Sequence, residues 1–319
     1  MAGDLRLQAS HAGNGVSAPL AHCTAGEVKA LDGLNFSVEQ GEIFGLMGPD
    51  GSGKTTCLRI LCGLMRPTNG KAMVLGCDMD KNPEAIKDQI GYMAQPAKLY
   101  EDLTVKENIE LYADLYQVPS ERYEQRMKRL LEFSGLAPFT ERLFRQLSGG
   151  MKQKVGLSCA LIHTPKVLFL DEPTNGVDPV SRRDFWKILY ELHREGVTIL
   201  VASTYLDEAD RCHRVALFDH GKVRLVMEPL ALRSLVKGHL FDLRTPERRK
   251  AMRVLKSSPR VVQASLFGAG IHFSLRETAD LSPIENELSS SGLASFHLEP
   301  IQPSLEDVYL SLVEGNREP

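Results

Sequence analysis

The sequence predicts an α/β fold built on a parallel sheet, followed by a small α+β domain. Two segments carry the first prediction. An apolar run at residues 43–47 leads into a glycine-rich loop, and residues 55–61 then have the pattern of a helix. A second apolar run, at residues 167–170, ends in two carboxylates, as a buried parallel strand does at the sheet edge where α/β proteins bind ligands. Residues 237–319 alternate short strands with two expected helices, which predicts the small domain.

The glycine-rich loop has the pattern G-x-x-x-x-G-K-[ST]. Small residues in this pattern let consecutive backbone N–H groups surround a polyphosphate, while the lysine adds a mobile positive charge and the hydroxyl reaches magnesium. The helix N-terminus behind the loop attracts the same anion through its unpaired N–H groups. The expected phosphate-binding residues are Gly48, Pro49, Asp50, Gly51, Ser52, Gly53, Lys54, Thr55 and Thr56.

Two adjacent carboxylates, Asp171 and Glu172, close the apolar run at residues 167–170. At the carboxyl end of a parallel strand they face the crevice beside the glycine-rich loop. We therefore expect Asp171 to reach magnesium and Glu172 to reach a water molecule beyond the terminal phosphate.

A second candidate anion site lies at Ser148, Gly149 and Gly150. These residues stand at the expected start of a helix that runs to Pro165, where a hydroxyl and free N–H groups can hold an anion. One nucleotide cannot easily occupy this site and the glycine-rich loop in a single subunit. Ser148 also suits an ordinary N-cap, and it can serve both roles.

The segments between these motifs predict further helices and strands. Thr104 and Glu107 fit a capping box at the start of a helical region, and Gly135 closes the second helix of that region. Pro179 suits the first turn of a later helix, which is expected to bury Trp186. The elements expected after it are a strand at residues 197–201, a short acidic helix and a hairpin that turns at residues 220–221.

The bulk properties exclude several classes of protein. The net charge of −3, from 38 basic and 41 acidic residues, implies no broad positive surface, so no nucleic-acid partner is expected. The six cysteines show no C-x-x-C spacing, and most are expected to be buried thiols. The apolar stretches are far shorter than the about 20 residues of a membrane-spanning helix. Residues 1–19 lack the apolar core of a signal peptide and are expected to form a mobile leader.

The glycine-rich loop and three further motifs resemble those of ATP-binding-cassette (ABC) ATPases, and the four follow one another in the family's order. Residues 147–153 (LSGGMKQ) resemble their signature loop, residues 171–179 resemble the Walker B segment running into the D-loop, and Gln95 stands where the family keeps its Q-loop glutamine. The resemblance covers about residues 20–225. Residues 151–154, 176–183 and 305–309 further resemble the ATPase subunits of ABC-2-type exporters.

The resemblance implies a P-loop NTPase cassette at residues 20–230, with a RecA-like α/β core, an antiparallel β region and a helical subdomain at about residues 96–165. It implies that residues 237–319 form a small accessory domain. It also implies ATP and Mg²⁺ as cofactors, ATP hydrolysis, and a homo- or heterodimer of cassettes. The implied second partner is an ABC-2-type transmembrane permease, which would hold the chain at the cytoplasmic face of the inner membrane.

The resemblance assigns roles within the subunit that binds the nucleotide. Lys54 would neutralise β- and γ-phosphate oxygens, and Thr55 would ligate magnesium directly. Asp171 and Gln95 would hold the metal or its water molecules. Glu172 would orient or deprotonate the attacking water.

Other roles cross the expected dimer. Ser148 and Gly150 of one subunit would grasp the γ-phosphate held by the glycine-rich loop of its partner, so that ATP lies between two chains. Asp178 would link the two active sites. Closing of this dimer on ATP, and its release after hydrolysis, would move the permease between two states.

The chain departs from the family pattern where a switch histidine usually contacts the γ-phosphate. Counting back from Glu208 places Thr204 at that position, whereas counting forward from Ser203 and Thr204 places Tyr205 there. A hydroxyl can form a hydrogen bond but cannot carry positive charge near neutral pH. We therefore expect slowed hydrolysis, with Thr204 as the residue at the catalytic position.

A second departure concerns the nucleotide base. An aromatic residue usually stacks on adenine at about residues 22–24, but no Tyr, Phe or Trp precedes Phe36. His22 could stack in its place or could be an ordinary loop histidine. Weak selectivity between ATP and GTP is the resulting hypothesis.

Three functions remain open from the sequence. The leading hypothesis is the energy-coupling subunit of an exporter. A second is a degenerate cassette that binds ATP for assembly or regulation and leaves hydrolysis to a partner, which the missing histidine favours and Glu172 and Gln95 oppose. A third, a non-transport cassette ATPase, would typically show two cassettes or long heptad arms, and this sequence has neither.

Overall fold

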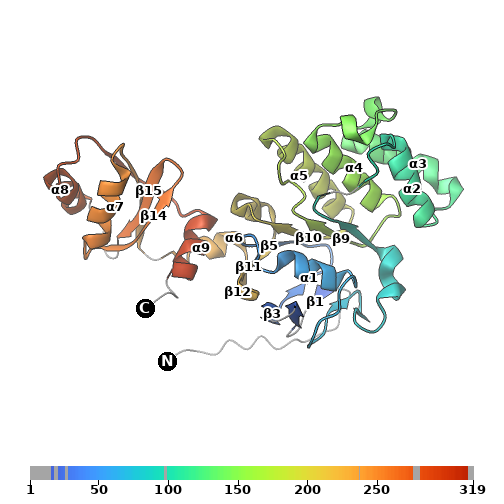
Figure 1. The fold of residues 1–319 in the computed structure, drawn as a ribbon, viewed down its shortest axis with the longest axis horizontal. Coiled ribbons are helices and arrows are strands. Elements are labelled where there is room, and N and C mark those ends of the chain that lie inside the picture. Colours follow the sequence, from blue (N-terminus) through green and yellow to red (C-terminus); the bar gives the residue numbers. More distant parts are fainter. Residues whose placement is uncertain are drawn as a thin grey trace. The chain divides into compact units, whose positions relative to one another are not determined.

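The computed structural model describes residues 16–17, 21–25, 28–96, 99–236, 238–275 and 281–314. The expected leader at residues 1–19 lies outside these residues except for positions 16 and 17. The chain divides into two compact units, with the boundary between Val226 and Met227 (Figure 1).

A six-stranded sheet forms the centre of the first unit, in the order β12–β11–β5–β10–β9–β8. The strands are β5 (Ile43–Met47), β8 (Ile90–Met93), β9 (Val167–Asp171), β10 (Thr198–Ser203), β11 (Arg214–Asp219) and β12 (Lys222–Met227). The β8–β9, β9–β10, β10–β5 and β5–β11 pairs are parallel, which confirms the predicted α/β class. Ser203 pairs with Met47, and Ala202 pairs with Asp171, so the carboxyl ends of β5, β9 and β10 meet at one edge.

Helices cover both faces of this sheet (Figure 1). Helix α1 (Lys54–Leu61) packs on β9 and β10 from one side, and α4 (Gly149–Leu161) and α5 (Pro179–Arg194) lie on the other. All five residues of β5 and all five of β9 are buried, as expected for strands covered on both faces. Trp186 on α5 is fully buried, as predicted.

Two smaller sheets lie in the same unit. One has the order β4 (Ser37–Val38), β1 (Val16–Ser17), β6 (Met73–Val74) and β7 (Cys77–Asp78), and the other pairs β2 (Ala21–Ala25) with β3 (Val28–Leu34). Their pairs are antiparallel, and β3 packs against α1. A 3₁₀ segment, Pro83–Gln89, leads into β8.

The helical region contains α2 (Val105–Leu115) and α3 (Ser120–Ser134), which both pack on α4. The predicted capping box is confirmed: the Thr104 hydroxyl accepts from the Glu107 backbone N–H at 3.1 Å, and the Glu107 carboxylate accepts from the Thr104 N–H at 2.8 Å. Gly135 ends α3 with φ +69°, a left-handed conformation that glycine adopts without a Cβ penalty.

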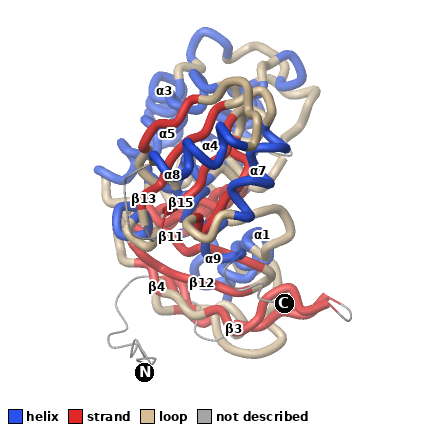
Figure 2. The backbone as a smooth tube through the Cα atoms, turned by 90° about the vertical axis from the view of Figure 1, so that its left-hand side faces the viewer, coloured by secondary structure: helices blue, strands red, loops and turns tan. Residues whose placement is uncertain are grey.

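The second unit is an antiparallel sheet with helices on its faces. The sheet has the order β14 (Val261–Phe267), β15 (Gly270–Leu275), β13 (His239–Arg244) and β16 (His297–Pro300). Helices α7 (Arg248–Ser257) and α8 (Ser282–Ser290) bury their apolar sides against one face of β13 and β15 (Figure 2). Helix α9 (Leu305–Glu314) packs on the short helix α6 (Pro229–Arg233).

The short acidic helix predicted after β10 is present as a 3₁₀ helix, Leu206–Arg211. One expectation about elements was wrong. Within the described residues, the second unit has three helices beyond residue 237 rather than two, because residues 305–314 form α9. The sequence did not predict α9 because the amphipathic pattern of this helix is short and follows two prolines.

Candidate functional site

The glycine-rich loop joins the end of β5 to the first residue of α1, Lys54. Gly48 and Gly53 have φ angles of +158° and +106°. A Cβ added to Gly48 would lie 2.3 Å from the Phe218 carbonyl oxygen, and one added to Gly53 would lie 2.7 Å from Leu31 Cδ2. Glycine at these two positions therefore lets the loop pass close to β11 and β3. The tip of the loop, at residues 49–51, is exposed.

Lys54 is buried, with 4% of its side chain exposed. Its Nζ donates to the carbonyl oxygens of Gly48 at 2.8 Å and Pro49 at 3.0 Å, and lies 3.3 Å from Glu172 Oε1. The loop thus curls around a positive charge, and two of the three groups that hold this charge are neutral carbonyls. An anion with several oxygens can replace such carbonyls as acceptors for Nζ.

Asp171 meets Thr55 across the sheet edge. The Thr55 hydroxyl donates to Asp171 Oδ1 at 2.9 Å, although 116 positions separate the two residues. Burial raises the pKa of Asp171, an effect opposed by the Thr55 hydrogen bond and by the charges of Arg59 and Lys54. A hydroxyl and a carboxylate side by side are oxygen ligands of the kind that Mg²⁺ takes.

The sequence analysis missed Tyr92, on β8. Its hydroxyl lies 3.5 Å from Asp171 Oδ2 as a donor. Burial, with the nearby Asp171 charge as a smaller cause, raises the pKa of Tyr92 to about 12. The alternation of β8 beside β9 could have indicated this residue, but only after the two strands were known to be neighbours.

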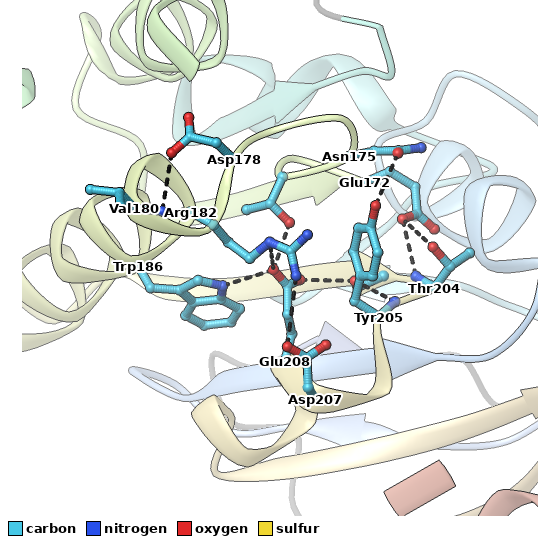
Figure 3. Close-up of polar contacts among 12 residues, drawn as sticks. Glu172, Asn175, Asp178, Val180, Arg182, Trp186, Thr204, Tyr205, Asp207 and Glu208 are labelled. Carbon is cyan, nitrogen blue, oxygen red and sulfur yellow. Dashed lines mark hydrogen bonds and ion pairs between the residues drawn. The ribbon is translucent and has the colours of Figure 1, made fainter. Parts of the chain in front are cut away.

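Glu172 is held from two sides. Its Oε1 faces Lys54, and its Oε2 accepts hydrogen bonds from the Thr204 backbone N–H at 3.0 Å and the Thr204 hydroxyl at 3.2 Å (Figure 3). Burial raises the pKa of Glu172, and the contacts with Thr204 and Lys54 oppose this. Of the two registers that the sequence left open, the structure places Thr204 against this carboxylate, while the Tyr205 hydroxyl points to Asn175 at 3.4 Å.

The remaining candidate residues lie elsewhere in the unit. Ser148 caps α4, where its hydroxyl accepts from the Met151 N–H at 3.3 Å, and Ser148 and Gly149 are exposed. Asp178 caps α5 through the N–H groups of residues 180 and 181. Gln95 is exposed after the end of β8. Among the described residues, no hydrogen bond joins Ser148 or Asp178 to Lys54, Thr55 or Glu172.

Two further candidate residues, Gly150 and His22, remain to be placed. Gly150 is buried against Ser181 of α5, where a Cβ would lie 2.7 Å from the Ser181 Cβ. The side chain of His22 lies outside the described residues, although its backbone belongs to β2.

The hydroxyl of Ser52 gives a second indication, besides the motif, that the loop fits a polyphosphate. Ser52 Oγ is buried inside the loop, and no described group forms a hydrogen bond with it. Buried hydroxyls in folded proteins nearly always have a partner. An unpaired hydroxyl in the loop that surrounds a buried ammonium group is the arrangement expected where phosphate oxygens supply the missing acceptor.

Comparison with known proteins identifies the family. The family model described as "ABC transporter" matches residues 31–175, which contain Lys54, Asp171 and Glu172. The daunorubicin resistance ATP-binding protein DrrA2 of Streptomyces coeruleorubidus is 36% identical over 299 residues, covering 92% of each chain. The chain belongs to the family of ABC transporter ATP-binding proteins. The probable multidrug ABC transporter ATP-binding protein YbhF of Escherichia coli is 42% identical over 288 residues.

This ABC chain spans about half the length of YbhF, since the match covers 90% of the chain and 49% of that protein. Solved ABC cassettes share the fold. An ATP-binding subunit of an ABC transporter aligns with a TM-score of 0.63 at 29% identity, covering 69% of this chain and 92% of the other. The cassette MJ0796, solved as a dimer bound to ADP and phosphate, aligns with a TM-score of 0.62 at 27% identity, covering 67% and 98%.

No helix among the described residues is both long enough and apolar enough to cross a bilayer.

Proposed function

We propose that this chain is the ATP-binding and ATP-hydrolysing subunit of an ABC-2-type exporter, and that ATP drives two cassettes together. The observation that carries the proposal is the convergence of Lys54, Thr55, Asp171 and Glu172 at one edge of the sheet, within 3.3 Å of a partner in each case. Relatives named for multidrug transport, daunorubicin resistance and Nod factor export support the exporter role. A transmembrane permease is then the second partner and holds the chain at the cytoplasmic face of the inner membrane.

Four residues bind the nucleotide and its metal in this proposal. Bound MgATP supplies the phosphoryl group to be transferred and the metal charge that neutralises its oxygens. Lys54 Nζ exchanges its contacts with the Gly48 and Pro49 carbonyls for phosphate oxygens. The hydroxyl of Thr55 and the carboxylate of Asp171 hold Mg²⁺, and Gln95 joins them from the end of β8. Ser52 Oγ gains the partner that it otherwise lacks.

Glu172 is the proposed base. Its Oε2 is fixed by two Thr204 donors, and Oε1, which lies 3.3 Å from Lys54 Nζ, is the oxygen that accepts the proton of an attacking water. Burial raises the pKa of Glu172, which makes the carboxylate a stronger base as long as it stays ionised beside Lys54. The contact with Thr204 orients the base, and this is the task we assign to the residue at the switch position.

The dimer provides the second set of phosphate contacts. Ser148 and Gly149 are exposed at the N-terminus of α4, where free N–H groups attract an anion, and Gly150 lies in the same turn. Asp178 is exposed at the start of α5 and can reach across an interface. We assign these residues to the triphosphate bound by the partner cassette. The MJ0796 dimer supports this arrangement.

A degenerate cassette is the second candidate, because Thr204 cannot carry the charge of a histidine. One experiment separates the two. ATP turnover is measured on the purified chain and on Glu172→Gln, with the exposed Glu191→Gln on α5 as the matched control. Loss of a general base lowers kcat by about 100-fold or more. We expect this loss in Glu172→Gln only, with MgATP still bound and an ATP-dependent dimer on gel filtration.

Two results of that experiment would reject the proposal. If Glu172→Gln left ATP turnover unchanged, Glu172 of this chain would not be the catalytic base, and the degenerate cassette would be the better description. Absence of MgATP binding in calorimetry would reject both. Comparing ATP with GTP in the same calorimeter tests the weak base selectivity, which strong preference for ATP would overturn.

A further inference from the structure

Glu208 follows the turn that carries Thr204, and its side chain is completely buried. Its Oε1 accepts hydrogen bonds from the Thr174 hydroxyl at 2.6 Å and from Trp186 Nε1 at 3.1 Å, and its Oε2 accepts from the Ser203 hydroxyl at 2.8 Å (Figure 3). A buried carboxylate is costly unless hydrogen bonds satisfy it. Because these donors come from the β9–α5 loop, from α5 and from β10, Glu208 fixes the three elements to one another.

Arg182 of α5 adds a charge to this cluster. Its Nε lies 3.8 Å from Glu208 Oε1, and its side chain is only 19% exposed. The guanidinium carbon lies 4.1 Å from the centre of the Tyr205 ring, a cation–π contact (Figure 3). A second carboxylate, Asp207, lies 3.7 Å away on the exposed side. The guanidinium therefore connects α5 to the Tyr205 ring and to the buried Glu208.

The backbone between Ser203 and Tyr205 is fixed by the same cluster. The Ser203 hydroxyl donates to Glu208 and accepts from the Tyr205 backbone N–H at 3.1 Å. Thr204 lies between these two residues, and both of its donors point to Glu172 Oε2. Since a hydrogen bond of 3.0 Å is lost after a shift of about 1 Å, a small rotation of this turn is enough to release the carboxylate.

We propose that Arg182 and Tyr205 are positioning residues for ATP hydrolysis, because their stacked contact holds the turn at residues 203–205 so that Thr204 keeps both donors on Glu172. This proposal rests on the proposed function of the site. Among the described residues, these two form no hydrogen bond or ion pair with the glycine-rich loop, Asp171 or Glu172, and they act only through Thr204. The ring of Tyr205 carries the effect, whereas its hydroxyl, 3.4 Å from Asn175, contributes little.

The first test does not involve turnover. Hydrogen exchange of the Thr204 amide is measured by NMR or mass spectrometry in the nucleotide-free chain. Arg182→Met and Tyr205→Leu should each raise its exchange rate about 10-fold, as an N–H without an acceptor becomes open to solvent. Tyr205→Phe keeps the ring and should exchange like the wild type. The neighbouring exposed Arg183→Met on α5 is the matched control.

The second test is the split between kcat and KM. Because a misplaced catalytic group slows the chemical step, Arg182→Met and Tyr205→Leu should lower kcat about 10-fold while KM for MgATP stays within about twofold. Arg182→Lys, which keeps the charge, should recover part of the loss, and Tyr205→Phe most of it. The double variant should be no slower than either single variant, because both residues act through one contact.

The outcomes separate this proposal from the function on which it rests. Unchanged exchange at Thr204 in both Arg182→Met and Tyr205→Leu overturns the positioning role, as do kcat losses that add in the double variant. Faster exchange at Thr204 in the two variants, together with a wild-type chain that does not hydrolyse ATP, supports the structural contact but removes its role in hydrolysis, and then the proposed function fails with it. If Arg182→Met does not fold, Arg182→Lys and the two Tyr205 variants still decide.

Discussion

The most direct test of the site geometry is a pair of substitutions in the glycine-rich loop, Gly48→Ala and Gly51→Ala. At Gly48, with φ +158°, a Cβ would lie 2.3 Å from the Phe218 carbonyl oxygen and 3.0 Å from Ser52 Oγ. Phe218 lies in β11, which is paired with β5, so this oxygen cannot withdraw without disturbing the sheet. Overpacking and a glycine-only backbone conformation each cost about 1–3 kcal/mol, so we expect a loss of about 2–6 kcal/mol.

Gly51 provides the control within the same loop. Its φ is +75°, but nothing lies within 4 Å of a Cβ added there, so only the left-handed conformation is penalised. We expect Gly51→Ala to lower the free energy of unfolding by about 1–2 kcal/mol.

Urea unfolding followed by tryptophan fluorescence measures both variants. Trp186 is the single tryptophan of the chain and lies in the core of the first unit, so its signal reports on the unit that contains the loop. Calorimetry should show that Gly48→Ala has lost MgATP binding while Gly51→Ala has kept most of it. Equal destabilisation by the two variants, or Gly48→Ala within about 1 kcal/mol of wild type, would refute the loop geometry.

Three further predictions concern other parts of the first unit. Thr204→His should raise ATP turnover by restoring a group that can carry charge, and unchanged turnover would contradict the expectation that the missing switch histidine slows hydrolysis. Burial raises the pKa of Asp219, but the hydrogen bonds from Arg224 and the adjacent histidine more than offset this and leave the pKa below its ordinary value. The stabilisation is then present above the unfolded-state pKa and is lost as the pH falls through the folded-state pKa, so Asp219→Asn should lower the unfolding free energy by about 1–2 kcal/mol at neutral pH and by less near pH 3 in urea titrations. Burial raises the pKa of Cys57 to about 12, so a thiol reagent at pH 8 should label the partly exposed Cys77 long before Cys57; comparable labelling in peptide mapping would show that the core around α1 opens.

Local features of the fold were predictable because their physics is local. The capping box at Thr104, the left-handed glycine at residue 135 and the proline at the start of α5 each depend on neighbours within four positions, and all three were found where the sequence placed them. The third helix of the second unit was missed because its pattern is short and depends on packing against α6.

The sequence by itself determined the α/β class, the loop that ends at Lys54 and the order of strands and helices that leads to an ABC cassette, because residue spacing sets backbone conformation and the burial pattern. Only the tertiary structure decided that Thr204 rather than Tyr205 meets Glu172, that Tyr92 contacts Asp171, and that Glu208 accepts a hydrogen bond from Trp186. These contacts join residues 22–79 positions apart. Such contacts exist only after the parallel strands pair in register and bring their carboxyl ends to one edge, and no local preference of the chain contains that information.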